Sequence, residues 1–415
     1  MLIKSKRFKT IAVALSLVLI LGGLAPQALA ARTSSDIDYS LRKAIDYYYI
    51  SAPSTDWKYA LGLAAAGDSG ALSFQVGNPD LSVITDIANR IIGLIASRQD
   101  PTAVEINGKL QDLVQMLAAS QNPDGHFGPA DATLNTTVWG VIALDMAANN
   151  GVAGANNCYN IDQAMAYIAS CQTQEGGFDE SGWGVDADST AHVLLAVAPH
   201  LPADSPVVTK AIGYLKSKQL ESGGIDNWGD NPSSTAAVIE ALIALGQDPQ
   251  GPEWTKKGNN LVDSLLSFQA ASGGFIQDTN WGPLDHTPYA LLALADLANK
   301  DSKYQRPLIV TPADIHLFAE SGASLPAGHD ADLVIQTKNL AADKKPVLVI
   351  AVLYDSQGKM VQYAYASREI APGDTERFGL GFGLPTSSGY QVKIMVWDSW
   401  ENRHPMANSI TIPVF

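Results

Sequence analysis

Acidic residues that could donate a proton occur as a short run in the middle of the chain. Asp186-Ala187-Asp188-Ser189-Thr190 places two carboxylates two positions apart, and His192 follows one helical turn after Asp188. A carboxyl group that its surroundings keep neutral can act as a general acid. The same side chains can instead cap the start of a helix, with Asp188 and His192 as a structural pair within it. The composition of the run favours capping over acid catalysis.

Three loops repeat the dipeptide Trp-Gly, and each has carboxylates nearby. Indole faces beside carboxylates could bind an apolar ring, a sugar, a corrinoid or metal ions. Alternatively, each tryptophan could seal one structural unit against the next, and both interpretations stay open at this point. The candidate ligand-binding residues are Trp183, Trp228, Trp281, Asp179, Asp186, Asp226, Asp230, Asp278, Asp285 and His286.

These loops belong to an internal repeat of about fifty residues. A glutamine precedes a glycine by four positions in each copy, at Gln121, Gln172, Gln219 and Gln269. Three copies continue as Gly-Gly followed by an apolar residue, at 176–178, 223–225 and 273–275. Each copy then reaches a threonine that is followed by Ala- and Leu-rich sequence, at Thr137, Thr190, Thr235 and Thr287. A fixed period of this length indicates stacked units, none of which buries its apolar face alone.

Each repeat predicts a helical hairpin. Its first helix, such as 161–171, ends near a glycine that can adopt a left-handed cap, and its second begins near the threonine. Asn135, Ser233 and Asp285 are expected in the N-cap region that Asp186, Asp188 and Ser189 occupy in their own copy. Further helices are expected upstream over 39–50, 56–66, 81–97 and 103–119. We expect two concentric helical rings, free of strands, between residues 35 and 300.

The pattern Gln-x-x-x-Gly-x-aromatic, at 172–178 and 269–275, resembles the prenyltransferase and squalene-oxidase repeat. That superfamily includes terpenoid cyclases, protein prenyltransferases, vitamin B12 carriers and exported bacterial proteins, so the resemblance implies an α/α-toroid without specifying the chemistry. Residues 186–191 are similar to the Asp-x-Asp-Asp-Thr-Ala motif of class II terpene cyclases, whose central Asp protonates an alkene or epoxide. This similarity implies Asp188 as the acid, with Asp186 and His192 beside it, but Ser189 replaces the last Asp.

Asp285-His286-Thr287 resembles part of the zinc site of protein prenyltransferases. The Asp-x-Cys partner of that site is missing, because neither Cys158 nor Cys171 has an acidic residue two positions before it. We therefore expect no zinc, no other metal and no cofactor. A helix between the cysteines would separate them by about 15 Å, so both are expected to be free thiols.

The first thirty residues have the features of a secretory signal peptide. Lys4, Lys6, Arg7 and Lys9 precede an apolar run, and Ala28-Leu29-Ala30 offers a cleavage site. Loss of the four positive charges would change the formal net charge from −15 to −19. Such a protein would be repelled by nucleic acid and by anionic lipid. We expect a secreted or cell-surface protein without a membrane span once the signal is removed.

After residue 305 the hydrophobic period changes from that of helices to that of strands. Alternating segments appear at 332–336, 347–354, 359–366, 375–382, 390–397 and 409–415, with one more near 314–319. Seven strands separated by turns are typical of an immunoglobulin-like sandwich. The predicted organisation is therefore a signal peptide over 1–30, an α/α-toroid over 31–305 and an all-β module over 306–415.

The sequence is compatible with three functional hypotheses. The leading hypothesis is an exported protein that binds a small apolar or cyclic ligand, or a surface partner, without catalysis. The second is a squalene-hopene-cyclase-like enzyme that uses Asp188 as its acid, and the third is a structural surface protein. The incomplete acidic motif and the predicted export favour binding, because polyprenyl substrates are made inside the cell.

Overall fold

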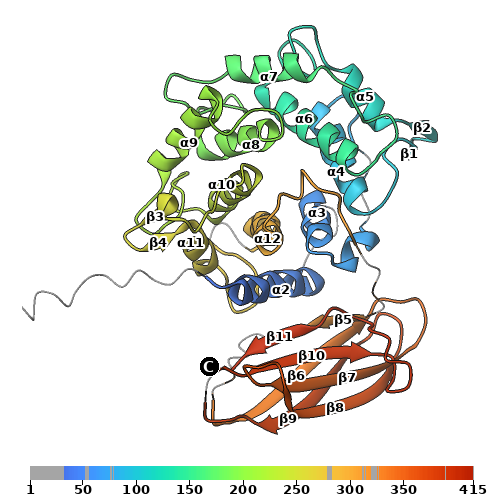
Figure 1. The fold of residues 1–415 in the computed structure, drawn as a ribbon. Coiled ribbons are helices and arrows are strands. Elements are labelled where there is room, and N and C mark those ends of the chain that lie inside the picture. The colour runs from blue at the N-terminus through green and yellow to red at the C-terminus, as the bar shows by residue number, and fades with distance from the viewer. Residues whose placement is uncertain are drawn as a thin grey trace, which may run out of the picture.

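The computed structural model describes residues 32–51, 56–74, 77, 79–277, 283–310, 313, 315–318, 325, 327–387 and 389–414. The predicted signal peptide, Trp281 and Asp278 lie outside these residues. The described part contains a helical ring followed by a β-sandwich (Figure 1). None of its helices is both long and apolar enough to cross a membrane.

The helices form two concentric layers (Figure 1). Each inner helix packs against the next, and the last packs against the first, so the ring is closed. The inner layer comprises α3 (Trp57–Ala65), α4 (Ile84–Ala96), α6 (Leu134–Asn149), α8 (Ala187–Val197), α10 (Pro232–Ala244) and α12 (Pro283–Asn299). The outer layer comprises α2 (Ser34–Ser51), α5 (Leu113–Ala119), α7 (Ile161–Ser170), α9 (Pro206–Lys218) and α11 (Leu261–Ser267). The 3₁₀ helices η1 (Ser69–Ser73) and η2 (Pro252–Trp254) lie in connections between them.

The expectation of a strand-free ring was wrong in two connections. Antiparallel pairs are formed by β1 (Val104–Ile106) with β2 (Lys109–Gln111), and by β3 (Thr255–Lys256) with β4 (Asn259–Asn260). The turn of the first pair has positive φ at both Asn107 and Gly108, the two-residue geometry that favours a hairpin. The helix expected over 103–119 is therefore confined to α5.

The repeat glutamine and glycine join one outer helix to the next. Gln172 Nε2 donates to the carbonyl oxygens of Gly176 and Val207, at 2.9 Å in each case. Gln269 makes the equivalent bonds to Gly273 and to Ser40, which joins the last repeat to the first helix and closes the ring.

The first glycine of each Gly-Gly pair has the positive φ that the sequence predicted. At Gly223 φ is 92°, and an added Cβ would lie 2.2 Å from the carbonyl oxygen of Asn260. A larger residue therefore cannot take this place without moving the next outer helix.

The repeat threonine anchors the Gly-Gly loop to the inner helix. Thr190 Oγ1 accepts a bond from the Phe178 amide at 3.0 Å, and the other three copies make the same bond. The inner helices start three or four residues before this threonine, earlier than the sequence predicted. Asp186 and Asn231 are the N-caps, as expected for Asp186. The capping prediction was wrong for residues that lie inside the first helical turns, namely Asn135, Asp188, Ser189, Ser233 and Asp285.

The segment after α12 crosses the C-terminal ends of the inner helices, which we call the floor of the ring (Figure 1). Lys303 is fully buried there and binds Glu240 of α10 at 2.5 Å and Asp296 of α12 at 2.9 Å. Neighbouring residues of the segment bind the ends of α6, α10 and α3, through Tyr304 with Asn149, Gln305 with Ala244, and Arg306 with Ala65.

The C-terminal module is a sandwich of two antiparallel sheets, as predicted. One sheet has the order β11-β10-β7-β8, with β11 (Ile410–Pro413), β10 (Gln391–Trp397), β7 (Lys345–Tyr354) and β8 (Met360–Ile370). The other has the order β5-β6-β9, with β5 (Ile315–Phe318), β6 (Asp330–Asn339) and β9 (Thr375–Gly383). Alternate residues of the strands fill one core between the sheets.

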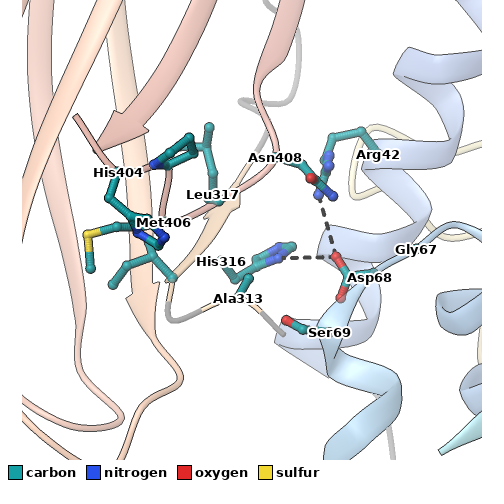
Figure 2. A pocket seen from close by; sticks show the side chains of 13 residues that line it. Arg42, Gly67, Asp68, Ser69, Ala313, His316, Leu317, His404, Met406 and Asn408 are labelled. Atoms are coloured by element: carbon teal, nitrogen blue, oxygen red, sulfur yellow. Dashed lines mark ion pairs between the residues drawn. The ribbon is translucent and has the colours of Figure 1, made fainter. Parts of the chain in front are cut away.

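The sandwich contacts the ring through β5 and β11, which lie against α2. His316 of β5 is buried, with Nε2 2.9 Å from Asp46, and its ring stacks on Tyr49. Its Nδ1 lies 3.7 Å from Asp68 (Figure 2). Although burial acts in the opposite direction, His316 and Arg42 lower the pKa of Asp68 to about 2. A cavity of about 210 Å³ between Arg42, Asp68, His316 and Asn408 remains at this interface (Figure 2).

Candidate binding site at the ring mouth

The N-terminal ends of the inner helices α6, α8, α10 and α12 meet at one side of the ring, which we call the mouth. Side-chain and backbone bonds join neighbouring ends directly. The Asn135 amide donates to the Glu180 carbonyl at 2.9 Å. Ser233 Oγ lies 2.8 Å from His286 Nδ1. The mouth is therefore a continuous structure built from consecutive repeats.

The two carboxylates of the acidic run have different surroundings. Asp186 accepts the Ser189 amide at 2.7 Å and is an ordinary cap. Asp188 points elsewhere: its Oδ1 is out of contact with solvent and has no hydrogen-bond donor in the described part of the chain. Burial raises the pKa of Asp188, against the opposing effects of the nearby Ser234 hydroxyl and of His192. Asp188 therefore holds a proton more strongly than an exposed carboxyl group.

His192 forms an ion pair that the sequence did not reveal. Its Nδ1 lies 2.7 Å from Glu180 Oε1, and both side chains are largely buried. Burial alone would lower the pKa of His192, but Glu180, with a further contribution from Asp188, raises it to about 9. The imidazole is therefore a cation at neutral pH. Glu180 lies in the loop twelve residues before His192, so helical spacing gave no sign of the pair.

A series of aromatic side chains from three inner helices begins at this ion pair. The Trp139 ring lies 5.1 Å from His192 and 5.3 Å from Trp57. Lys58 Nζ lies 4.8 Å from the centre of Trp57 and 5.0 Å from that of Tyr289. The lysine ammonium thus already occupies the aromatic faces on this side.

Trp183 and Trp228 stand on the rim of the mouth, in equivalent loops before α8 and α10. They are 91% and 94% exposed. The interpretation that each tryptophan seals its own repeat is therefore wrong for these two, since a sealing side chain would be buried. The structure does not describe the third, Trp281.

The aspartates beside these tryptophans hold the loops in shape. Asp179 accepts the amides of Gly182 at 2.7 Å and Gly184 at 3.0 Å, on either side of Trp183. Asp226 accepts the Gly229 amide at 3.1 Å, and Trp228 itself has a φ of 60°. These bonds hold the loop backbone on which the indoles stand, with Trp228 in a backbone region that costs free energy for a non-glycine residue.

Of the other predicted residues, Asp230 and His286 make contacts within the fold, and Asp285 is exposed to solvent. Asp230 accepts hydrogen bonds from Ser222 at 2.5 Å and Ser264 at 3.5 Å, so it fastens the Gly223-Gly224 turn. His286 is buried against Ser233, whereas Asp285 is exposed. No group of three metal-binding side chains occurs in the described residues. Cys158 and Cys171 are both free thiols, as the sequence predicted.

The depth of the ring is limited by its floor. Glu240 lies two turns below Ser233 on α10, and it affects the pKa of His192. Below it, Lys303, Asp296 and Tyr304 are buried. Charged groups are therefore present from the mouth of the ring down to its floor. An apolar chain inside the ring would need hydrocarbon contacts at these positions.

No known protein family and no curated protein matches the sequence. The solved type II terpene cyclase MstE from Scytonema is similar at a TM-score of 0.47 and 13% identity, over 65% of this chain and 100% of that chain. A variant in complex with geranylgeranyl dihydroxybenzoate gives 0.44 and 11%, over 64% and 97%. A Bacteroides uniformis beta-glucuronidase gives 0.19 and 14%, over 24% of this chain and 13% of that chain.

Proposed function

We propose that this chain is an exported binding protein that holds a ring-bearing ligand on the Trp183 and Trp228 loops, without catalysis. The near-complete exposure of both indoles carries the proposal. Burial of one large apolar side chain is worth about 1.5–3 kcal/mol, and the folded chain leaves this free energy unused. Tryptophan is enriched among the anchor residues of binding surfaces.

The charge of the mouth restricts the ligand. Asp179, Glu180 and Asp226 lie in the rim loops, and the whole chain has a formal net charge of −15. An anionic ligand would be repelled. A neutral or cationic ligand with a flat apolar face, such as a sugar or another ring compound, fits these conditions.

One observation favours the cyclase-like alternative. The carboxyl group of Asp188 has a raised pKa and an oxygen without a hydrogen bond, as an acid that protonates an alkene would require. The buried Lys303–Glu240–Asp296 group stands against it, because it occupies depth that a polyprenyl chain would need. Binding therefore remains the better supported function.

The first experiment tests the mouth. Native mass spectrometry of the gently purified full chain should detect a retained molecule, and tryptophan fluorescence should respond to cyanocobalamin. Both signals should fall about tenfold or more in Trp183→Ala/Trp228→Ala, and Trp400→Ala in the sandwich is the matched control. Equal binding by parent and double variant, or no binding by the parent, contradicts the proposal.

The second experiment tests the alternative. The full chain is incubated with squalene or geranylgeranyl diphosphate, and products are separated by gas chromatography with mass detection. We expect no cyclised product. A product that is made by the parent and lost in Asp188→Asn would make the protein an enzyme.

The third experiment tests export. Expression with the native N-terminus in a bacterial host, followed by N-terminal sequencing of the extracellular protein, should give a chain that begins at Ala31. Retention of the uncleaved chain in the cytoplasm would remove export from the proposal.

A further inference from the structure

The sheet that contains β7 and β8 has an apolar outer face in addition to its core face. Leu348, Ile350 and Val352 of β7 are buried on that outer face, separate from the core between the two sheets. The strand register places Tyr365 of β8 opposite Ile350 and Tyr363 opposite Val352. Tyrosines of the neighbouring strand thus flank the buried residues.

Four aromatic side chains form one cluster on this face, which we call the aromatic patch. They are Tyr363 and Tyr365 of β8, Trp397 of β10, and Trp400 in the loop after β10. The Trp400 ring lies 5.3 Å from Tyr365, 5.8 Å from Trp397 and 6.5 Å from Tyr363. Despite these contacts, Tyr363, Tyr365 and Trp400 are 52%, 54% and 40% exposed. The rings hold each other in place and still present a large surface to solvent.

A cavity of about 320 Å³ lies against the aromatic patch. Tyr365 and Trp400 line one part of it together with residues 346–348 of β7. The other lining residues are polar, namely Ser367, Arg368, Glu369, Asp398, Ser399 and Glu401. Its volume lies at the lower end of the range for small-ligand sites. Aromatic faces and hydrogen-bonding groups therefore meet in one concave surface.

The charges around this cavity exclude an anionic ligand. Arg368 is paired with Glu376 at 2.6 Å, and Lys344 with Glu369 at 2.6 Å. Asp398 and Glu401 add two further carboxylates to the lining. The cavity lining carries three carboxylates, Glu369, Asp398 and Glu401, and one cation, Arg368, so nucleic acid and anionic lipid would be repelled.

The aromatic patch is open to large partners. β8 is the sheet edge opposite β11, and β11 is the strand that lies against α2 of the ring. Figure 1 shows β8 on the side of the sandwich away from the ring. The ring therefore does not cover this face.

We propose that the aromatic patch is a carbohydrate-binding site that holds a neutral polysaccharide. A sugar ring has a flat face of C–H groups that can stack on Tyr365 and Trp400, and its hydroxyl groups can donate to Asp398 and Glu401. Tyrosine and tryptophan suit such a wet contact, since each combines an apolar ring with a polar atom. The site is separate from the ring mouth and stands whether or not the mouth binds a ligand.

The test uses sedimentation of the full chain with insoluble cellulose, chitin and β-1,3-glucan. We expect at least one of them to bind the parent, and Tyr365→Ala/Trp400→Ala to lower its affinity about tenfold or more. Tyr363→Ala should give a smaller loss in the same direction. Leu110→Ala, at an exposed apolar residue of β2 outside both proposed sites, is the matched control and should bind like the parent. Comparison of the patch variant with Trp183→Ala/Trp228→Ala separates failure at the patch from failure at the mouth.

Three results would overturn the proposal. The first is that none of the three polysaccharides binds the parent, and the second is that the Tyr365→Ala/Trp400→Ala variant binds as well as the parent. The third is a parent dimer in light scattering that becomes monomeric in Tyr363→Ala and in the double variant, because the patch would then join two copies of the chain. Circular dichroism must show the parental fold in each variant, and Tyr363→Ala keeps the test valid if the double variant unfolds.

Discussion

The mouth and the floor of the ring both contain ionisable groups, but their surroundings differ. At the mouth, Asp188 and His192 belong to a loop and helix that repeat along the chain, and the rim carries tryptophans in solvent. At the floor, Lys303 comes from a segment outside the repeats and is fully enclosed with Glu240 and Asp296. The mouth therefore retains surface and charge that a ligand could use, whereas the floor groups satisfy one another.

The two ends of the same helical ring therefore differ in role. The mouth carries a candidate binding site, and the floor carries buried ion pairs that close the other end of the ring. The floor needs its lysine, because two buried carboxylates without a cation would be costly. The mouth instead keeps a neutralised pair, Glu180 with His192, beside a carboxyl group whose pKa is raised.

The largest effect is expected at the floor. Lys303→Met leaves Glu240 and Asp296 buried without their cation, so the free energy of unfolding should fall by about 3–5 kcal/mol in urea titrations. Burial raises the pKa of both carboxyl groups, so part of the loss should be recovered on lowering the pH. A matched variant that adds Glu240→Gln and Asp296→Asn should be more stable than Lys303→Met. Equal stability of Lys303→Met and the parent would show that the floor needs no cation.

An intermediate effect is expected from the pH dependence of the mouth. The pKa of His192 is raised to about 9 in the folded chain, against about 6.5 when unfolded. This stabilisation is complete below about pH 6.5 and is lost as the pH rises through 9, by about 3 kcal/mol in total. Urea unfolding at pH 6 and pH 9.5 should show the loss in the parent and a smaller one in His192→Gln. Equal slopes for the two proteins would mean that Glu180 does not hold the imidazole in its charged form.

The smallest effects should separate the two aspartates of the mouth. Asp186→Ala removes an N-cap and should lower the free energy of unfolding by about 1 kcal/mol. Asp188→Asn removes a charge that burial disfavours, so stability near pH 7 should stay the same or rise slightly. Thermal melts of the two variants beside the parent give the comparison. A greater loss for Asp188→Asn than for Asp186→Ala would contradict the raised pKa of Asp188.

The sequence alone determined the features that depend on local period and turn chemistry. Gln172, Gly176 and Thr190 recur at similar spacing because each repeat makes the same bonds to its neighbour, and those bonds require these residue types. The seven strands of the sandwich were also predictable, since alternation and turn residues mark a strand wherever one face is buried. The dipeptide Asn107-Gly108 is itself typical of a hairpin turn, and both of its residues have positive φ. It lies within 103–119, where the surrounding residues predicted a helix.

Only the tertiary structure decided which side chains meet across the fold. Lys303 lies 63 positions after Glu240, and Trp400 lies 35 after Tyr365, so neither contact has a local spacing that a sequence pattern could reveal. The sequence also could not show whether a side chain is exposed to solvent. A tryptophan that seals a repeat and one that stands in solvent have the same neighbours along the chain. Burial depends on what the remaining elements bring to each side chain, and that is settled only when the ring closes and the two sheets pack.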